Sequence, residues 1–233
     1  MIFLQAEAAQ AVTEQLVENP VLTQVVETSN KMNLWEMALK GGWIMVVLAI
    51  LSVLCFYIFF ERLAVYKKAQ KTDTSFMDRI RDYVQNNETK SAINYCRVVG
   101  TPIANMIEKG IERIGRPAAD VRASIDNAGN LEVSRLEKGL SIMATISSGA
   151  PMIGFLGTVL GMVRAFWEMA NAGNNIDITL LAGGIYEAMI TTVGGLIVGI
   201  IAMFAYNYLV SRVDSITNQL EAQTLAFMDM IKE

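Results

Sequence analysis

Two apolar stretches near the C-terminal end decide the fold: GAPMIGFLGTVLGMVRAF, Gly149 to Phe166, and GGIYEAMITTVGGLIVGIIA, Gly183 to Ala202. A simple membrane anchor consists of Leu, Ile and Val, whereas both stretches also contain glycine and threonine, and the second carries Glu187. A carboxylate in a membrane span is costly, so it usually faces a protein interior or a watery path. The two stretches therefore predict a chain that moves something small across a membrane.

Three segments are free of charge and close to the length that a bilayer requires, roughly 20 apolar residues for about 30 Å of hydrocarbon. They are residues 43–60, 139–163 and 188–211. Of the 233 residues, 53% are hydrophobic and only 18% are charged, which is less charge than a soluble domain of this size carries. We predict an all-α membrane protein with three transmembrane helices and long cytoplasmic helical extensions.

The charge pattern divides the chain into seven parts: an N-terminal segment 1–42, a span 43–60, a helical domain 61–138, a span 139–167, a turn 168–177, a span 178–210 and a helical tail 211–233. Residues 61–138 contain 14 of the 19 Lys and Arg residues, and residues 168–184 contain none. The positive-inside rule then predicts that the helical domain and the tail are cytoplasmic, with the N-terminus and the turn outside.

The N-terminal forty residues lack the basic start of a secretory signal, so we predict no signal peptide. Residues 33–40 predict a helix at the membrane interface, with Trp35 and Trp43 at the level of the lipid headgroups. Cys55 and Cys96 fall on different sides of the predicted interface, so we expect no disulfide between them. The chain has no histidine, which is the commonest metal ligand and proton shuttle.

Helical periodicity continues through the cytoplasmic parts. Thr101-Pro102 opens one helix, and Gly115-Arg-Pro117 separates it from the next, which we expect to run from Asp120 without a break into the second span. We expect the third span to continue into the tail as one long helix. An apolar seam on the tail packs either on residues 61–138 or on the same seam in other copies of the chain. The seam has heptad-like spacing and consists of Leu209, Val213, Ile216, Leu220, Phe227 and Met230.

Small residues line one side of each of the last two spans: Gly154, Gly157 and Gly161 in the second, and Gly195 and Gly199 in the third. Small residues let helices approach closely in lipid, so plain helix packing explains these glycines without any ion path. Pro151 is different, because proline breaks the backbone ladder and neighbours must satisfy the carbonyl that it frees. It predicts a bent helix beside a cavity.

Two threonines are expected at one depth in the membrane. Thr158 lies nine residues inside Trp167, roughly 13 Å deep at about 1.5 Å per residue, and Thr192 lies at a similar depth in the third span. A lone threonine in a span usually bonds the carbonyl four residues before it. Two hydroxyls at one level, with Glu187 nearby, leave a functional pair and this structural role both open.

Glu187 precedes Thr191 by four residues, so the two side chains share a face of the third span. The carboxylate either extends to the outer interface or forms, with the threonines, the polar wall of an ion path. Arg164, at the outer end of the second span, is either an interface anchor or a partner for Glu168 or Glu187.

Both spans carry a family resemblance. The string APMIGFLGTVLGM, Ala150 to Met162, resembles the second-span signature of the ExbB/TolQ/MotA proton-channel family, and EAMITTVGGLIV, Glu187 to Val198, followed by Tyr206-Asn207, resembles its third-span signature. The resemblance covers about residues 30–233. Three spans with an outside N-terminus resemble the ExbB and TolQ branch, and ExbB most of all, whereas the MotA branch has four. One departure is at Ile200-Ile201-Ala202, where that branch often carries a proline.

The resemblance implies that Thr158, Thr192 and Glu187 match the polar pore-lining positions and that Pro151 matches the proline of the family. It implies a homo-oligomer, a pentamer, in the inner membrane of a Gram-negative bacterium, around a dimer of a single-span ExbD- or TolR-like partner whose aspartate binds and releases protons. A TonB-like protein then passes the work to outer-membrane transport. A TolQ-like or gliding role stays open, as does the choice between H⁺ and Na⁺.

Other function classes find less support in the residues. No Ser–His pair, metal-ligand set or pair of carboxylates indicates an enzyme or a bound cofactor. No basic patch indicates nucleic acid. The expected partners are copies of the chain, the single-span protein, the TonB-like protein and membrane lipid. A passive membrane scaffold, with glycines for packing and no ion path, is the alternative from another class.

Overall fold

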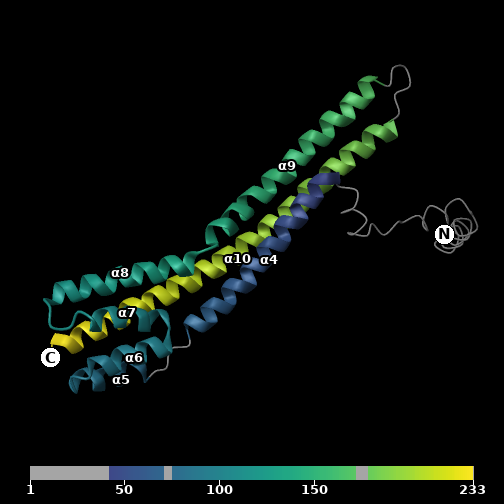
Figure 1. The fold of residues 1–233 in the computed structure, drawn as a ribbon. Helices are drawn as coiled ribbons and strands as arrows, with labels where there is room; N and C mark the ends of the chain where they lie inside the picture. The colour runs from purple at the N-terminus through teal and green to yellow at the C-terminus, as the bar shows by residue number, and fades with distance from the viewer. Residues whose placement is uncertain (1–41, 71–74, 172–177, 233) are drawn as a thin grey trace, which may run out of the picture. The chain divides into compact units, whose positions relative to one another are not determined.

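The structure is a computed structural model that describes residues 42–70, 75–171 and 178–232, and in these ranges it contains helices and no strands. The helices are α4 (Gly42–Ala69), α5 (Phe76–Gln85), α6 (Thr89–Val99), α7 (Pro102–Ile111), α8 (Ala118–Glu137), α9 (Leu140–Asn171) and α10 (Ile178–Lys232). Helices α9 and α10 lie side by side with α4 against them, and α5 to α8 gather beside the C-terminal half of α10 (Figure 1). The expected interfacial helix with Trp35, and residues 172–177 of the expected turn, lie outside the described residues.

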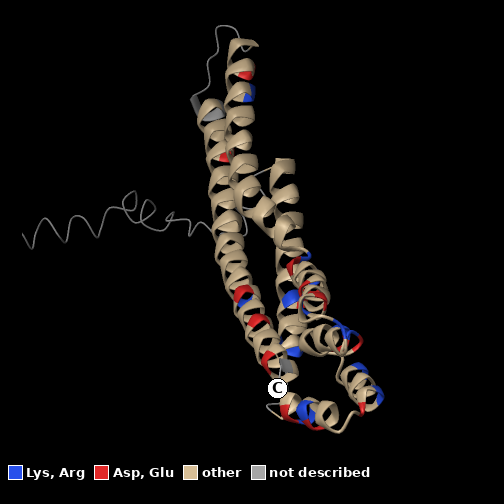
Figure 2. Ribbon diagram, turned by 90° about the vertical axis from the view of Figure 1, so that its left-hand side faces the viewer, with Lys and Arg blue, Asp and Glu red and all other residues tan. Residues whose placement is uncertain are grey.

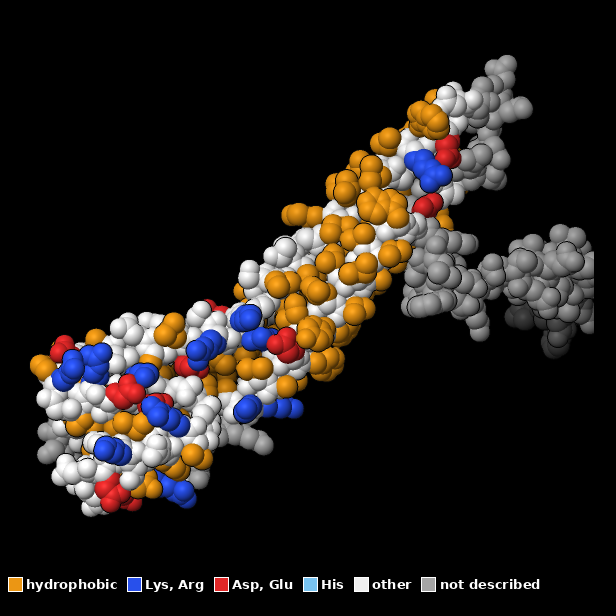
Figure 3. Space-filling model, in the orientation of Figure 1, with side chains coloured by type: hydrophobic (Ala, Val, Ile, Leu, Met, Phe, Trp, Pro, Cys, Tyr) orange, Lys and Arg blue, Asp and Glu red, His pale blue; other side chains and the backbone are white. Residues whose placement is uncertain are grey.

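Three helical stretches are long and apolar enough to cross a membrane, which confirms the predicted number: α4, Ala118–Asn171 and Leu181–Ile231. Hydrophobic side chains predominate on the face of α4, α9 and α10 that Figure 3 shows, while charged side chains gather over the shorter helices. Figure 2 shows the same division of charge from a second side. Large apolar side chains such as Phe155, Phe166 and Phe204 are exposed there, as expected of a surface that contacts lipid tails.

The helix boundaries depart from the prediction at the start of the second span. We expected one helix from Asp120 into that span, and this expectation is wrong, because α8 ends at Glu137 and α9 begins at Leu140. Gly139 between them has φ of 88°. Glycine adopts this left-handed conformation at little cost, and an α-helix cannot continue through it. Helix α8 of the basic domain and helix α9 of the membrane part are therefore separate helices that meet at a two-residue joint.

The third span and the tail form one helix, as predicted. Helix α10 has 55 residues, about 82 Å at 1.5 Å per residue, and it continues through Ile200-Ile201-Ala202. Of the two predicted partners for the tail seam, the structure shows the chain's own domain, since α10 packs on α5, α7 and α8. Five seam residues are buried: Leu209, Val213, Ile216, Leu220 and Phe227.

Local sequence explains the start of α7 and its contact with α10. Thr101 caps the helix by accepting a hydrogen bond from the Ala104 N–H, and Pro102 occupies the first turn, as expected. A Cβ added at Gly110 would lie 2.7 Å from both Ile125 and Phe227. The missing side chain lets α7, α8 and α10 converge on one core.

Cys96 of α6 provides a test of this core. The residue is fully buried, and burial, with a smaller effect of the Glu108 charge, raises the pKa of its thiol to about 12 from 9.0. The thiol should therefore be neutral and inert at neutral pH, since the thiolate is the reactive form. Because the folded pKa is raised, the protonated thiol contributes its full stability below about pH 9 and loses it between pH 9 and 12.

We expect iodoacetamide to label Cys96 at least about 100-fold more slowly in the folded protein than in denaturant. The Cys55→Ser background isolates the signal, because Cys55 is the other free thiol. Equal rates before and after denaturation at pH 7 would show that α6 is not packed as described.

Candidate functional site

Helices α9 and α10 approach each other along matching ladders of small residues. A Cβ added at Gly195 would lie only 2.6 Å from the Ala150 carbonyl oxygen and 2.8 Å from the Gly154 Cα, so the two backbones are nearly in contact. The steps along both ladders are four, three, four and four residues. On α9 the ladder is Ala150, Gly154, Gly157, Gly161 and Ala165, and on α10 it is Gly184, Ala188, Thr191, Gly195 and Gly199.

This close approach brings three threonine hydroxyls to one backbone carbonyl. The Gly154 carbonyl lies 3.2 Å from the hydroxyl oxygens of Thr191 and Thr192 and 3.4 Å from that of Thr158. The Thr158 and Thr192 hydroxyls are also in direct hydrogen-bond contact with each other. The two hydroxyls that the sequence places at one depth therefore meet between the helices.

The cluster offers more acceptor sites than protons. Each hydroxyl has one proton to donate, while its oxygen and each carbonyl oxygen can accept two bonds. The Ala188 carbonyl is a second shared acceptor, 2.7 Å from the Thr191 hydroxyl and 3.3 Å from that of Thr158. Hydroxyl protons can thus rotate between partners, and lone pairs remain that can accept from water or stabilise a cation.

The three threonines differ in exposure. Thr191 is 3% exposed, and its hydroxyl lies against the space where Gly157 lacks a Cβ, so it serves the helix contact. Thr158 and Thr192 are half-buried. They are the part of the cluster that reaches the surface of the helix pair.

Glu187 lies one helical turn from the threonines, beside the first residues of α4. Its carboxylate lies 2.9 Å from the position that a Cβ on Gly42 would take. A hollow of about 100 Å³ connects Glu187 and Thr191 with Gly157 and the start of α4. Glu187 is half-buried and shares this hollow with Thr191, whereas Thr158 and Thr192 do not line it.

Of the two carboxylates that the sequence offered as partners, Arg164 pairs with Glu168, which lies on its own helix. Its guanidinium Nε lies 2.9 Å from a Glu168 carboxylate oxygen, and its side chain is 75% exposed. Arg164, Glu168 and Glu187 also line one hollow of about 300 Å³ with Gly161 and Gly184. One cation and two carboxylates therefore gather beside Ala165 and Gly184, at the end of the two ladders.

Pro151 packs against Gly199. A Cβ on Gly199 would lie 2.6 Å from the proline Cδ and 3.1 Å from the Ser147 carbonyl oxygen. Pro151 has no N–H to donate to this carbonyl, which lies four residues before it in the helix. Helix α9 continues through Pro151. The side of the proline ring that faces α10 is occupied by protein, so the cavity expected beside it is not on that side.

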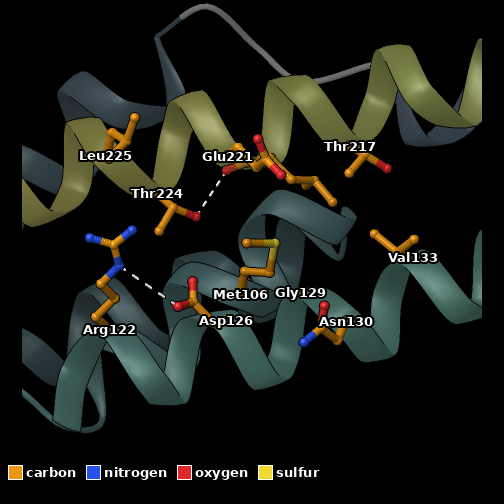
Figure 4. A pocket seen from close by; sticks show the side chains of 11 residues that line it. Met106, Arg122, Asp126, Gly129, Asn130, Val133, Thr217, Glu221, Thr224 and Leu225 are labelled. Atoms are coloured by element: carbon orange, nitrogen blue, oxygen red, sulfur yellow. Dashed lines mark hydrogen bonds and ion pairs between the residues drawn. The ribbon is translucent and has the colours of Figure 1, made fainter. Parts of the chain in front are cut away.

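A larger hollow of about 520 Å³ lies elsewhere, between α8 and the tail of α10 (Figure 4). Met106 lines it beside Gly129, and Arg122, Asp126 and Glu221 provide its charged groups. Thr217 on this wall is 25 residues from Thr192 along α10, about 37 Å. This hollow is therefore separate from the threonine cluster.

Sequence reasoning missed five members of this site. The Gly154 and Ala188 carbonyls are acceptors that no side-chain motif reveals, and the contact of Gly42 with Glu187 joins elements far apart in the chain. Ala165 and Gly184 do carry a signal. They continue the four-three-four spacing of the glycines by one turn.

The chain is similar to proteins of one family. A family model described as the MotA/TolQ/ExbB proton channel family matches residues 99–222, which include both threonine-bearing segments. A biopolymer transport protein ExbB homolog from Methanothermobacter thermautotrophicus is 28% identical over 187 residues, 80% of this chain and 66% of the relative.

Two further relatives represent two branches. The Tol-Pal system protein TolQ of Haemophilus influenzae is 28% identical over 201 residues, 80% of this chain and 88% of the relative. The biopolymer transport protein ExbB of Neisseria meningitidis is 24% identical over 193 residues, 77% of this chain and 86% of the relative.

Proposed function

Because the chain belongs to the MotA/TolQ/ExbB proton channel family, we propose that it is the wall-forming subunit of a proton-driven motor in the inner membrane. The observation that carries this proposal is the contact of Thr158 with Thr192 at the Gly154 carbonyl. An apolar helix pair that only anchored or packed would need no such oxygen cluster. Hydroxyl and carbonyl oxygens lower the cost of a proton or hydronium ion that passes between apolar helices.

The motor needs a second group that binds and releases the proton, since hydroxyls do not titrate near neutrality. We assign that group to the carboxylate of a single-span, ExbD- or TolR-like partner, present as a dimer inside a ring of this chain. Protonation would neutralise the partner carboxylate and let it move along apolar surface. Ionisation would return it to the hydroxyls of Thr158 and Thr192, so that proton flow drives relative rotation.

The finer role we propose is that of ExbB, passing work through a TonB-like protein to outer-membrane transport. The sequence signatures and the match to ExbB of Neisseria meningitidis support this assignment. A TolQ role in envelope maintenance is the second candidate, because the TolQ match covers 88% of that relative. The basic domain of residues 61–138 supports a cytoplasmic position for α5 to α8 and an outside N-terminus.

Glu187→Gln tests whether the carboxylate belongs to the path. The amide keeps the shape and removes the charge, and hydrogen bonds to charged groups contribute about 1.5–3 kcal/mol, so we expect coupled outer-membrane transport to fall roughly tenfold or more. Glu168→Gln is the control, because Glu168 pairs with Arg164 on its own helix. Wild-type uptake with Glu187→Gln, together with inert threonine variants, would favour the passive scaffold.

Native mass spectrometry of the chain, purified alone and with a co-expressed single-span partner, tests the assembly. We expect a ring of five copies that takes up two partner chains. A monomer or dimer that ignores the partner would contradict the motor and leave the small-residue ladders as ordinary helix packing.

A further inference from the structure

The joint between α8 and α9 leaves backbone carbonyls to be satisfied. The last carbonyls of a helix have no partner within it. At the end of α8, the left-handed Gly139 and the extended Lys138 turn the chain before α9 begins, so α9 cannot supply these partners in line. The joint is visible in Figure 1 where the ribbon of α8 passes into that of α9.

Two side chains of α4 provide the missing partners. Arg62 donates from Nη1 to the Arg135 carbonyl at 3.3 Å, and Tyr66 donates from its hydroxyl to the Leu136 carbonyl at 2.9 Å. Arg62 is 8% exposed and Tyr66 only 1%. A second nitrogen of Arg62 pairs with Glu61 at 2.8 Å, which holds the guanidinium in place.

The same end of α8 is tied to α7 on another side. Glu132, which is 8% exposed, pairs with Arg135 at 2.6 Å and accepts a hydrogen bond from Asn105 of α7 at 3.1 Å. The joint itself also lies close to α4, because a Cβ on Gly139 would be 3.4 Å from Ile58. Helices α4, α7 and α8 thus meet at the joint through buried polar contacts.

We propose that Arg62 and Tyr66 are positioning residues that clamp the carbonyl end of α8 to α4 and so fix the direction in which the cytoplasmic helices leave the α9–α10 pair. The consequence for coupling rests on the proposed function. Movement generated at the threonines reaches the cytoplasmic helices through α10, which is continuous, and through this joint. When the Arg62 and Tyr66 hydrogen bonds are broken, α9 can rotate without moving α8, and part of the motion from the threonines does not reach the cytoplasmic helices.

Tyr66→Phe and Arg62→Met, singly and together, remove the donors and keep most of each side chain's volume. In the full assembly we expect amides of residues 130–145 to exchange with deuterium roughly tenfold faster or more in the double variant, because two hydrogen bonds to the helix end are lost. Coupled uptake should fall by more than about threefold. Arg62→Lys, which keeps a donor, should restore most of both. Tyr57→Phe, an exposed tyrosine of the same helix, is the matched control.

Unchanged exchange at 130–145, or faster exchange with full uptake, would overturn the proposal. If the double variant fails to assemble, the single Tyr66→Phe variant is judged by the same two measurements. A failure of the proposed function is seen separately. In that case the threonine variants leave transport unchanged, while hydrogen exchange still reports on the clamp.

Discussion

Thr158→Val combined with Thr192→Val is expected to reduce coupled transport by at least about 100-fold, because two charge-stabilising hydrogen-bond partners of about 1.5–3 kcal/mol each are lost. Valine replaces the hydroxyl with a methyl group of similar size, so the helices should still pack. The Gly154 carbonyl keeps a donor in Thr191 at 3.2 Å. Coupled outer-membrane transport in cells, and proton flux into proteoliposomes in sodium-free buffer, measure the loss.

Two matched variants separate the ion path from general damage. Thr145→Val, on the same helix, removes a hydroxyl that bonds the Ser141 carbonyl of its own helix, and it should leave transport near the wild-type level. Thr158→Ser keeps the hydroxyl and should retain most of the activity. Intact transport in the double valine variant would make the path assignment wrong. Flux that requires sodium would replace the proton with Na⁺.

Gly195→Ala is expected to have the largest effect on folding. Its methyl group would meet the Ala150 carbonyl at 2.6 Å and the Gly154 Cα at 2.8 Å. Both are backbone atoms that no rotamer change can move, so α9 and α10 must separate. Overpacking of this kind costs about 1–3 kcal/mol, and separation also breaks the threonine cluster. Thermal unfolding of the purified protein in detergent, together with coupled uptake, measures both effects.

The same substitution at two other glycines is the control. Gly149 of α9 and Gly183 of α10 have open space where a Cβ would go. Alanine there should be neutral or stabilise its helix by roughly 0.5–1 kcal/mol, since glycine is the poorer helix former. A thermal midpoint for Gly195→Ala equal to that of Gly183→Ala would contradict the close helix contact.

Some features of this protein could be predicted from local sequence. The three spans follow from charge-free apolar runs, and the long α10 follows from the apolar seam that begins at Leu209. Thr101 and Pro102 mark the start of α7 because helix caps use a few residue types at fixed positions. The shared depth of Thr158 and Thr192 required only the rise per residue of a helix.

The helix break at Gly139 could not be predicted with equal ease. Glycine occurs seventeen times in this chain, and most glycines in the last two spans lie inside continuous helix. What distinguishes Gly139 is the α4 surface beside it. There Arg62 and Tyr66 donate hydrogen bonds to the last carbonyls of α8, which offsets the cost of ending that helix. That surface is more than 70 residues away in sequence.

The sequence by itself determined which residues enter the membrane and which face of each span is small or polar, because hydropathy and helical period are properties of neighbouring residues. Only the tertiary structure decided that three hydroxyls converge on the Gly154 carbonyl, that Thr191 is buried while Thr158 and Thr192 reach the surface, and that α4 holds the end of α8. These features depend on the register between antiparallel helices. That register is set by backbone contact along two ladders of small residues, which neither helix can specify alone.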